Sequence, residues 1–470
     1  MQSEVDLMII GSGSTAFAAA LRATGYGASV LMFEKSVLGG TCINWGCIPS
    51  KTLIHAALFN YEATHGARVG LVDAGESKDP DAERLFRHRE AVVNGLRQER
   101  YLEVLAKMEG LKLIKGTARL VDARTVICDE RQYHAGHILV AVGGSPRIPD
   151  LPGLKRCDYL TSRSALLLKS FPRSLVIIGG GVVAVELGQM YHRMGCRVTI
   201  LEHGPRLLPA VEHELSAALE SVLVEEGIKV VTDVSFCSVD KLGELSVVYA
   251  DVGESRHKFT CERLLLAVGT TPATAGIGLE SAGVTVDSKG FIQVDEHMRT
   301  VVPGIWAAGD AVGRMMIATV GAREGIVAVD DMFNRSCGCK MDYLAAPMAV
   351  FTDPEVAIVG YDEESARKAG FDCMVNVMPV SAIPKAHVVS QTNGVIKMVA
   401  ERVTGRLLGV HLVCHRGADM INEAALALRM KATVDDLATT MHVYPSIGEG
   451  LKLCAQGFSR DISRLSCCAE

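Results

Sequence analysis

The sequence predicts an α/β protein in which two parallel-sheet units precede a smaller α+β unit near the C-terminus. In the first two thirds of the chain, short apolar segments rich in Val, Ile and Leu are typical of strands buried on both faces. Two of these segments lead through glycine-rich turns into helical patterns, as in strand–turn–helix units. From about Met341 the pattern changes to strands separated by polar turns, which predicts an α+β arrangement.

The composition excludes several classes of protein. A formal net charge of −6 gives no electrostatic reason to bind nucleic acid or an anionic membrane surface. No apolar run has the length of a membrane span, and Met1 leads almost directly into a predicted strand. We therefore expect a cytoplasmic protein with no signal peptide and no membrane insertion. Most of the 14 cysteines are scattered singly, as small core residues are, which argues against a disulfide scaffold.

The first strand–turn–helix unit carries a dinucleotide-binding fingerprint. A buried strand is expected over residues 5–10, and a second strand ends at Glu34, an acid suited to a ribose hydroxyl. Between them, Gly11 permits the tight turn, Gly13 permits close approach of a pyrophosphate, and Ala16 permits close helix packing. Strand, turn, helix, strand and acid together predict a Rossmann-like dinucleotide-binding domain.

The fingerprint occurs a second time. A strand over residues 175–178 leads into Gly179, Gly181 and Ala184, which open a helix, and a further strand ends at Glu202. Two fingerprints in one chain imply two bound dinucleotides.

Three charged residues around the second fingerprint have expected roles. Glu202 can accept hydrogen bonds from a free 2′-hydroxyl and would repel a 2′-phosphate, which favours NADH over NADPH. Arg206 is close enough in sequence to weaken that preference. Glu186, on the helix, is expected to pair with a cation such as Lys51; the alternative is a solvated helix charge.

Two nearly identical apolar segments end in glycine, at Gly143 and Gly269. We expect these to be crossing points between domains, where the backbone passes close to a cofactor. A further strand, over residues 304–308, meets a Gly309-Asp310 turn before a helix. The Asp310 side chain could cap that helix or hold a hydroxyl of a polyol chain.

Cys42 and Cys47 are the pair on which the predicted chemistry depends. Pro49 suits the first turn of a helix, so Cys47 is expected near a helix N-terminus. The partial positive charge of that terminus and the Lys51 ammonium both favour a thiolate, which makes the pair a candidate redox-active dithiol. Two alternatives are a pair of buried free cysteines and half of a zinc site, although no second pair with zinc-binding spacing is found.

Two further cysteine pairs lie near the C-terminal unit. Cys337 and Cys339 precede it in a predicted polar surface connection, and Cys467 and Cys468 lie in a polar tail. Adjacent cysteines at a chain end are not expected to be core residues, because termini fray.

The elements expected in the C-terminal unit are strands over 347–350, 356–359, 394–399 and 408–413 and helices over 418–430 and 449–454.

These motifs together resemble the pyridine nucleotide-disulfide oxidoreductases, the family of glutathione reductase and dihydrolipoamide dehydrogenase. The likeness covers nearly the whole chain and is most specific around Cys42 and Cys47 and at the Gly309-Asp310 turn. It implies FAD and a nicotinamide nucleotide as cofactors and a homodimer whose active sites combine both subunits. The implied domains are the two parts of an FAD-binding and central unit (1–148 and 272–342), an NAD(P)-binding domain (149–271) and an interface domain (343–470).

The resemblance also implies roles for individual residues. Cys47 would face the flavin and Cys42 would exchange with the substrate, with Lys51 beside them. The residues expected to contact the two nucleotides are Gly11, Gly13, Ala16, Glu34, Lys35, Gly40, Thr41, Lys51, Gly143, Gly179, Gly181, Ala184, Glu186, Glu202, Gly269 and Asp310.

One position departs from the disulfide-reducing members of the family. Those members carry a His-Pro with a Glu four residues after the Pro, and the imidazole protonates the leaving thiol. Here Tyr444 precedes Pro445, and Glu449 keeps the acidic position. A phenol with an ordinary pKa of about 10 is a poor base at pH 7. His442 would face another way on a helix, or be displaced along a strand, and is no simple substitute.

A Tyr at this position and a Cys467-Cys468 tail resemble the mercuric reductase branch of the family. Soft thiolates prefer thiophilic metals such as Hg(II). The resemblance implies that Cys467 and Cys468 of the partner subunit capture Hg(II) and pass it to Cys42 and Cys47, where NAD(P)H and FAD reduce it to Hg(0). Tyr444 and Glu449 would line that site. An additional N-terminal metal-binding module, frequent in this branch, is expected to be absent.

Two other functions are compatible with the sequence. One is a dihydrolipoamide dehydrogenase-like, NADH-linked disulfide oxidoreductase that has lost its usual base, which Glu202 supports. The other is a metal-sequestering thiol protein on a flavoprotein scaffold; the intact fingerprints and the Cys42/Cys47 pair argue against it.

Overall fold

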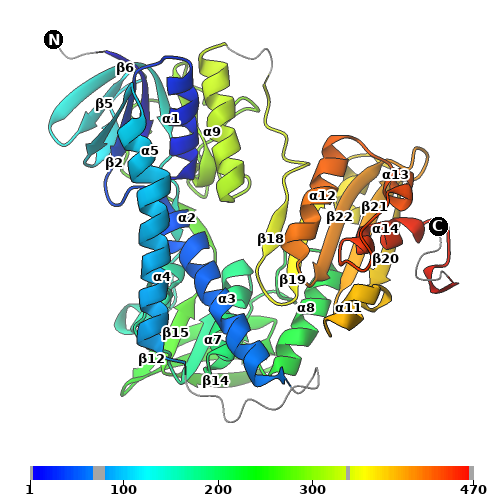
Figure 1. Cartoon of the computed structure of the whole chain (residues 1–470). Coiled ribbons are helices and arrows are strands. Elements are labelled where there is room, and N and C mark those ends of the chain that lie inside the picture. The colour runs from blue at the N-terminus through cyan, green and yellow to red at the C-terminus, as the bar shows by residue number, and fades with distance from the viewer. Residues whose placement is uncertain (1–3, 67–79, 335–338, 465–470) are drawn as a thin grey trace.

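The computed structural model describes residues 4–66, 80–334 and 339–464. In Figure 1, two α/β units lie at opposite ends of helix α4 (Ala82–Arg97), and a third unit lies beside them. The chain is α/β in the first two units and α+β in the third, which confirms the predicted fold class.

The first unit is built on a seven-stranded sheet with the order β3-β2-β1-β6-β5-β4, in which β17 also pairs with β6. The pairs β1/β2, β2/β3, β1/β6 and β17/β6 are parallel. Leu7 and Ile9 pack on one face with helices α1 and α9, and Met8 and Ile10 pack on the other, so β1 has no polar face. The strands are β1 (Val5–Ile10), β2 (Val30–Glu34), β3 (Leu111–Lys115), β4 (Ala118–Leu120), β5 (Thr125–Cys128), β6 (Arg131–Val140) and β17 (Ile305–Ala307).

The helices of this unit hold the first fingerprint and the dithiol segment. Helices α1 and α9 lie side by side against the sheet, and α2 and α3 lead from it toward the second unit (Figure 1). Their bounds are α1 (Ser14–Gly25), α2 (Gly40–Trp45), α3 (Cys47–Thr64), a π-helical turn (Gln98–Leu102), α5 (Glu103–Lys107) and α9 (Ala318–Met332).

The second unit contains a five-stranded parallel sheet with the order β11-β10-β9-β15-β8. Ile177 on β9 packs toward helix α7, whereas Val176 and Ile178 pack against an antiparallel sheet, β12-β13-β14, that the sequence did not lead us to predict. The elements are β8 (Tyr159–Thr161), α6 (Ser162–Ala165), β9 (Ser174–Ile178), α7 (Val182–Arg193), β10 (Arg197–Leu201), α8 (His213–Glu226), β11 (Lys229–Val231), β12 (Val234–Leu242), β13 (Leu245–Val252), β14 (Ser255–Cys261) and β15 (Arg263–Leu266).

The two glycine-ended segments cross between the units side by side, as predicted. After Gly143 the chain forms β7 (Gly144–Pro146), and after Gly269 it forms β16 (Thr270–Pro272); the two strands pair antiparallel. A Cβ on Gly144 would lie 2.5 Å from the Thr270 methyl carbon, so the crossing is tight at that glycine.

The third unit is an antiparallel sheet with the order β18-β19-β22-β21-β20, with α12, α13 and α14 beside it (Figure 1). The predicted strands and the two predicted helices are present, with ends shifted by one or two residues. The elements are β18 (Met348–Val350), β19 (Glu355–Gly360), α10 (Glu363–Lys368), β20 (Cys373–Pro379), α11 (Pro384–Val388), β21 (Val395–Glu401), β22 (Leu407–Cys414), α12 (Gly417–Arg429), α13 (Val434–Thr439) and α14 (Glu449–Gln456).

The singly placed cysteines are core residues with one exception. Cys237 is half-buried rather than buried, because its thiol lies on the outer strand β12 and donates a hydrogen bond to Asp251 (3.3 Å). The buried ones are Cys128, Cys157, Cys196, Cys261, Cys373, Cys414 and Cys454. Among the described residues, no helix has both the length and the apolar character needed to cross a bilayer.

Candidate active site

The two cysteines lie on consecutive helices that a glycine separates. Cys42 is on α2, and Cys47 is the first residue of α3, so the predicted position of Cys47 at a helix N-terminus is confirmed. Gly46 between the helices leaves no room for a side chain, since a Cβ there would lie 3.1 Å from the Thr41 carbonyl oxygen and 3.3 Å from the Cys42 Cα. The glycine therefore permits the close approach of the two thiols.

The two thiols differ in acidity. A hydrogen bond from the Cys42 thiol to the Cys47 sulfur lowers the pKa of Cys47 to about 7, and the charge of Lys51 acts in the same direction, against burial. The same hydrogen bond, together with burial, holds the pKa of Cys42 well above its ordinary range. Above about pH 7 the pair is therefore mainly one thiolate, Cys47, beside one thiol, Cys42.

A buried ion pair joins the dithiol helix to the second unit. The Lys51 ammonium lies 2.7 Å from the Glu186 carboxylate of α7, whose side chain is only 5% exposed, so the predicted pairing is confirmed. Glu186 also accepts a hydrogen bond from the backbone N–H of Phe351 (2.9 Å), and Lys51 lies 4.7 Å from the centre of the Phe351 ring. Both nucleotide units and the C-terminal unit thus meet at this carboxylate.

Tyr101 is a residue of the site that the sequence analysis missed. Burial raises the pKa of its phenol, and the negative charges of Cys42 and Cys47 raise it further. The ring lies beside the start of α2, since a Cβ on Gly39 would be 3.5 Å from it. Its ring also packs edge-on against Phe17, with the ring centres 4.8 Å apart. Tyr101 belongs to the π-helical turn after α4; such turns often occur at functional sites, but no spacing rule connects it to Cys47.

The first fingerprint forms a cradle for a dinucleotide. A Cβ on Gly11 would lie 2.2 Å from the Ala141 carbonyl oxygen, and a Cβ on Gly40 would lie 2.7 Å from the Gly13 Cα. Glu34, at the end of β2, accepts hydrogen bonds from the Ser12 hydroxyl and the Ser36 N–H, both at 2.5 Å. These close approaches are what a fingerprint turn requires, and Ala16 is fully buried beneath it.

Asp310 fits the role of a hydroxyl-binding acid. It lies in a 3₁₀ turn (Gly309–Ala311), and α9 begins only at Ala318, so Asp310 does not cap that helix. Burial raises the pKa of its carboxyl, and no hydrogen bond to that carboxyl is found among the described residues. A half-buried acid at the carboxyl end of β17, with no hydrogen-bond partner in the described part of the chain, suits a polyol chain. FAD has such a chain, so the residues present fit this cofactor.

The second fingerprint forms a similar cradle. A Cβ on Gly179 would lie 2.4 Å from the Ala267 carbonyl oxygen, whereas a Cβ on Gly181 would meet no protein atom within 4 Å, which leaves space for a ligand. The Glu202 carboxylate accepts hydrogen bonds from the backbone N–H groups of Gly180 and Gly204. Ala184 is fully buried, as a fingerprint helix requires.

Four other residues expected at the nucleotides occupy exposed or open positions. Lys35 and Thr41 are exposed, and Gly143 and Gly269 have positive φ angles (71° and 101°) with open space where a Cβ would project. Positive φ angles are conformations that glycine adopts readily.

Tyr444 and Glu449 do not join the dithiol within one chain. They lie in the C-terminal unit, and Figure 1 shows α14 well separated from α2. Glu449 is 9% exposed, burial raises the pKa of its carboxyl, and its Oε2 has no hydrogen-bond partner among the described residues. His442 is held by Glu423 (3.0 Å), which supports the expectation that it does not replace the missing imidazole.

Of the remaining predicted cysteines, only Cys339 is among the described residues. Cys337, Cys467 and Cys468 lie outside the described residues. Cys339 is half-buried, and its sulfur accepts a hydrogen bond from Arg323 at 3.7 Å.

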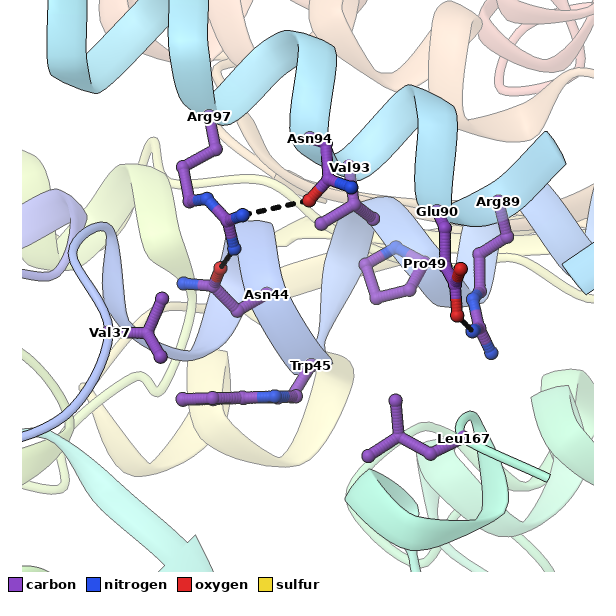
Figure 2. A pocket seen from close by; sticks show the side chains of 10 residues that line it. All are labelled: Val37, Asn44, Trp45, Pro49, Arg89, Glu90, Val93, Asn94, Arg97 and Leu167. Atoms are coloured by element: carbon purple, nitrogen blue, oxygen red, sulfur yellow. Dashed lines mark hydrogen bonds and ion pairs between the residues drawn. The ribbon is translucent and has the colours of Figure 1, made fainter. Parts of the chain in front are cut away.

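A pocket of about 170 Å³ lies next to the dithiol segment (Figure 2). Trp45 and Pro49 of that segment line it, and Arg97 of α4 reaches over it to donate a hydrogen bond to Asn44 (2.9 Å). The Asn44 amide in turn donates to the carbonyls of Leu38 and Gly40. These contacts fix the start of α2, and neither thiol lines the pocket.

Comparison with known proteins agrees with this geometry. Residues 5–325 match the family described as pyridine nucleotide-disulphide oxidoreductase, and residues 346–455 match the dimerisation domain of the same family. A mercuric reductase of Lysinibacillus sphaericus is 38% identical over 469 residues, which cover 100% of this chain and 85% of the relative. A dihydrolipoyl dehydrogenase of Thermus scotoductus is 37% identical over 461 residues, covering 97% of each chain.

A solved structure agrees at the level of the whole chain. The Cu(II) complex of the HOCl-induced flavoprotein disulfide reductase RclA from Escherichia coli superimposes with a TM-score of 0.86 at 28% identity, covering 97% of this chain and 99% of that one. The matched models, the full-length relatives and the two nucleotide cradles around a dithiol lead to one conclusion: the chain belongs to the pyridine nucleotide-disulphide oxidoreductase family.

Proposed function

We propose that the chain reduces Hg(II) to Hg(0) with electrons from a reduced nicotinamide nucleotide, using Cys42 and Cys47 as the metal-binding thiols. The observation that carries this proposal is the combination of a complete dithiol site with Tyr444 where disulfide-reducing relatives have a histidine. The full-length likeness to proteins named mercuric reductase supports it.

Family membership implies FAD and a reduced nicotinamide nucleotide, and the dimerisation domain supports a homodimer. Bound FAD would supply the two-electron path between the nicotinamide and the dithiol. Gly11, Gly13, Glu34 and Asp310 would hold it. On the same grounds we assign residues 1–148 and 272–342 to the FAD-binding and central unit, 149–271 to the NAD(P)-binding domain and 343–470 to the interface domain.

The dithiol is suited to binding a soft metal in two stages. The Cys47 thiolate is available near neutral pH and can displace a thiolate ligand from a Hg(II)–thiol complex. Cys42 keeps its proton until the metal arrives and loses it when its sulfur becomes the second ligand, because metal ligation requires the thiolate. Lys51 stabilises the first negative charge, and the Tyr101 ring lies beside Gly39 at the start of α2. The overall change is Hg(II) plus NAD(P)H giving Hg(0), NAD(P)⁺ and a proton.

Delivery of the metal is assigned to the C-terminal tail of the second subunit. Cys467 and Cys468 of the partner subunit would take Hg(II) from external thiols and exchange it onto Cys42 and Cys47. Tyr444 and Glu449 of the partner subunit would line the path. The separation of α14 from α2 within one chain supports a site shared between subunits, since Glu449 begins α14 and lies far from the dithiol of its own chain.

The second cradle favours NADH. Glu202 lies at the end of β10, and its two oxygens are held by the Gly180 and Gly204 N–H groups, so a negative charge stands where a ribose is expected. Arg206 donates instead to the carbonyls of Pro209 and Val211, both at 3.3 Å. One terminal nitrogen of Arg206 is therefore engaged with loop carbonyls, while its Nε has no partner among the described residues.

A dihydrolipoamide dehydrogenase-like activity is the second candidate. The full-length likeness to a protein named dihydrolipoyl dehydrogenase favours it, as does the NADH-type cradle. In that case Tyr444→His would restore a thiol-protonating group and raise dithiol turnover, and the Cys467/Cys468 pair would be dispensable.

The test is oxidation of NADH and of NADPH by the purified flavoprotein, with either Hg(II) in excess small thiol or lipoamide as acceptor. We expect mercury-dependent turnover that the Cys467→Ala/Cys468→Ala double variant loses at high thiol concentration. Turnover with lipoamide and none with mercury would contradict the proposal and favour the second candidate.

A further inference from the structure

A buried carboxylate on α9 holds the backbone of the Gly309–Asp310 turn. Glu324 is 1% exposed, and its Oε2 accepts a hydrogen bond from the Gly309 N–H at 2.7 Å. Its Oε1 accepts a second bond from the Tyr343 hydroxyl at 2.6 Å. Both oxygens of a buried acid are thus committed, one to the turn and one to the segment that leads into the C-terminal unit.

Close steric contacts restrict the turn in addition to these hydrogen bonds. Gly309 has a φ angle of 75°, and a Cβ there would lie 2.5 Å from the Thr15 Oγ1 of the first fingerprint helix. A Cβ on Gly321, one turn before Glu324, would also lie 2.5 Å from that oxygen. Helices α1 and α9 and the turn therefore meet in van der Waals contact, and a displacement of Glu324 is passed to Gly309.

Tyr343 is linked to residues on both sides of Asp310. It reaches Gly309 through Glu324, and its ring lies 5.6 Å from the guanidinium carbon of Arg314, four residues after Asp310. Arg314 is itself fixed by a hydrogen bond to the Val294 carbonyl (2.6 Å). Tyr343 lies between α9 and β18, on the connection to the C-terminal unit.

We propose that Glu324 and Tyr343 are positioning residues that hold Asp310 in its FAD-binding position and make FAD affinity depend on the connection to the C-terminal unit. Loss of the Tyr343 hydroxyl leaves a buried carboxylate oxygen unpaired, which costs free energy. This cost is relieved only if Glu324 moves, and the turn then moves with it. The inference concerns FAD binding alone and does not depend on which acceptor the enzyme reduces.

The experiment is titration of FAD-free protein with FAD, followed by flavin fluorescence, for Tyr343→Phe, Glu324→Gln and Glu324→Ala. Tyr26→Phe is the comparison variant, because the Tyr26 hydroxyl donates at the same 2.6 Å to another buried acid further along α9, Asp330, which also keeps its ion pair with Arg22. We expect Tyr343→Phe to weaken FAD binding about tenfold, in keeping with one hydrogen bond to a charged group. Glu324→Ala should weaken it more, and Glu324→Gln, which keeps an oxygen for the Gly309 N–H, less.

A purely structural role would give a different pattern. If Tyr26→Phe weakened FAD binding as much as Tyr343→Phe, or if Tyr343→Phe left the FAD dissociation constant unchanged, the proposal would be overturned. The melting temperature of each FAD-free variant provides the check on folding. We expect Tyr26→Phe to lower it less than Tyr343→Phe, because Asp330 keeps its Arg22 partner, and we expect only Tyr343→Phe to change FAD affinity.

Discussion

The Lys51 ammonium and the Glu186 carboxylate, 2.7 Å apart, form an ion pair that connects the dithiol helix of the first unit to the fingerprint helix of the second. The charges act on Cys47 with opposite sign: Lys51 lowers the pKa of its thiol and Glu186 raises it. Since the carboxylate is nearly excluded from water, the pair is more than an exposed surface contact.

Substitution of Lys51 and substitution of Glu186 should therefore move the Cys47 pKa in opposite directions. Lys51→Met removes a stabilising positive charge and should raise it; Glu186→Gln removes a negative charge and should lower it. The rate of alkylation of reduced protein by iodoacetamide, measured against pH and mapped to Cys47 by mass spectrometry, gives both values. A shift of the same sign in the two variants would contradict the electrostatic account.

The pH dependence of Cys47 reactivity follows from its pKa. Because the pKa is lowered to about 7, the thiolate is present above that pH and lost below it, so alkylation should be half-maximal near pH 7. Cys42→Ala removes the largest stabilising contact and should move the midpoint toward the ordinary thiol value of about 8.5. Cys42→Ser keeps a hydroxyl donor and should move it less. Equal midpoints in the two variants would show that the Cys42 hydrogen bond is not the cause.

Nucleotide preference should depend on Glu202. If its carboxylate binds the ribose hydroxyls of NADH, Glu202→Gln should lower kcat/KM for NADH by roughly tenfold to a hundredfold, the range for one hydrogen bond to a charged group. The value for NADPH should rise or remain unchanged, because a repulsive charge is lost. Stopped-flow measurement of flavin reduction with each nucleotide separates this step from metal chemistry. A parallel fall for both nucleotides would instead indicate a disturbed turn at Gly180.

A site shared between subunits makes a complementation prediction. A Cys42→Ala homodimer lacks an inner metal ligand, and a Cys467→Ala/Cys468→Ala homodimer lacks the delivery pair. Mixed dimers formed after dissociation and reassociation contain one site with both features, so they should regain mercury-dependent turnover of up to about half of the wild-type activity per dimer. Tagged subunits allow the heterodimer to be isolated. An inactive heterodimer would argue against delivery from the second subunit.

Features fixed by local sequence were predictable. Gly11 and Gly179 must have positive φ angles beside a neighbouring strand, and that requirement is visible as a glycine after a buried strand. Cys47 was placed at a helix start because Pro49 suits the first turn. Both inferences needed only neighbouring residues. The Lys51–Glu186 pair was also expected, as one of two alternatives for Glu186, although 135 residues separate its members.

Features that depend on long-range packing were not predictable. Tyr101 lies beside the start of α2 only because α4 packs along α2 and α3, and Glu324 reaches Gly309 only because α9 packs against α1. The sheet β12-β13-β14 was missed because its strands are mixed in polarity and sit on one face of the second unit. Cys237 was taken for a core residue because its exposure depends on that sheet.

The most direct test of the central claim is the yield of elemental mercury per nicotinamide oxidised. With Hg(II) in excess small thiol and oxygen excluded, we predict one Hg(0), measured as vapour, for each NADH consumed. Neither product should form in the Cys42→Ala variant. Oxidation of NADH without release of Hg(0), or Hg(0) release that persists in Cys42→Ala, would contradict reduction of the metal at the Cys42/Cys47 pair.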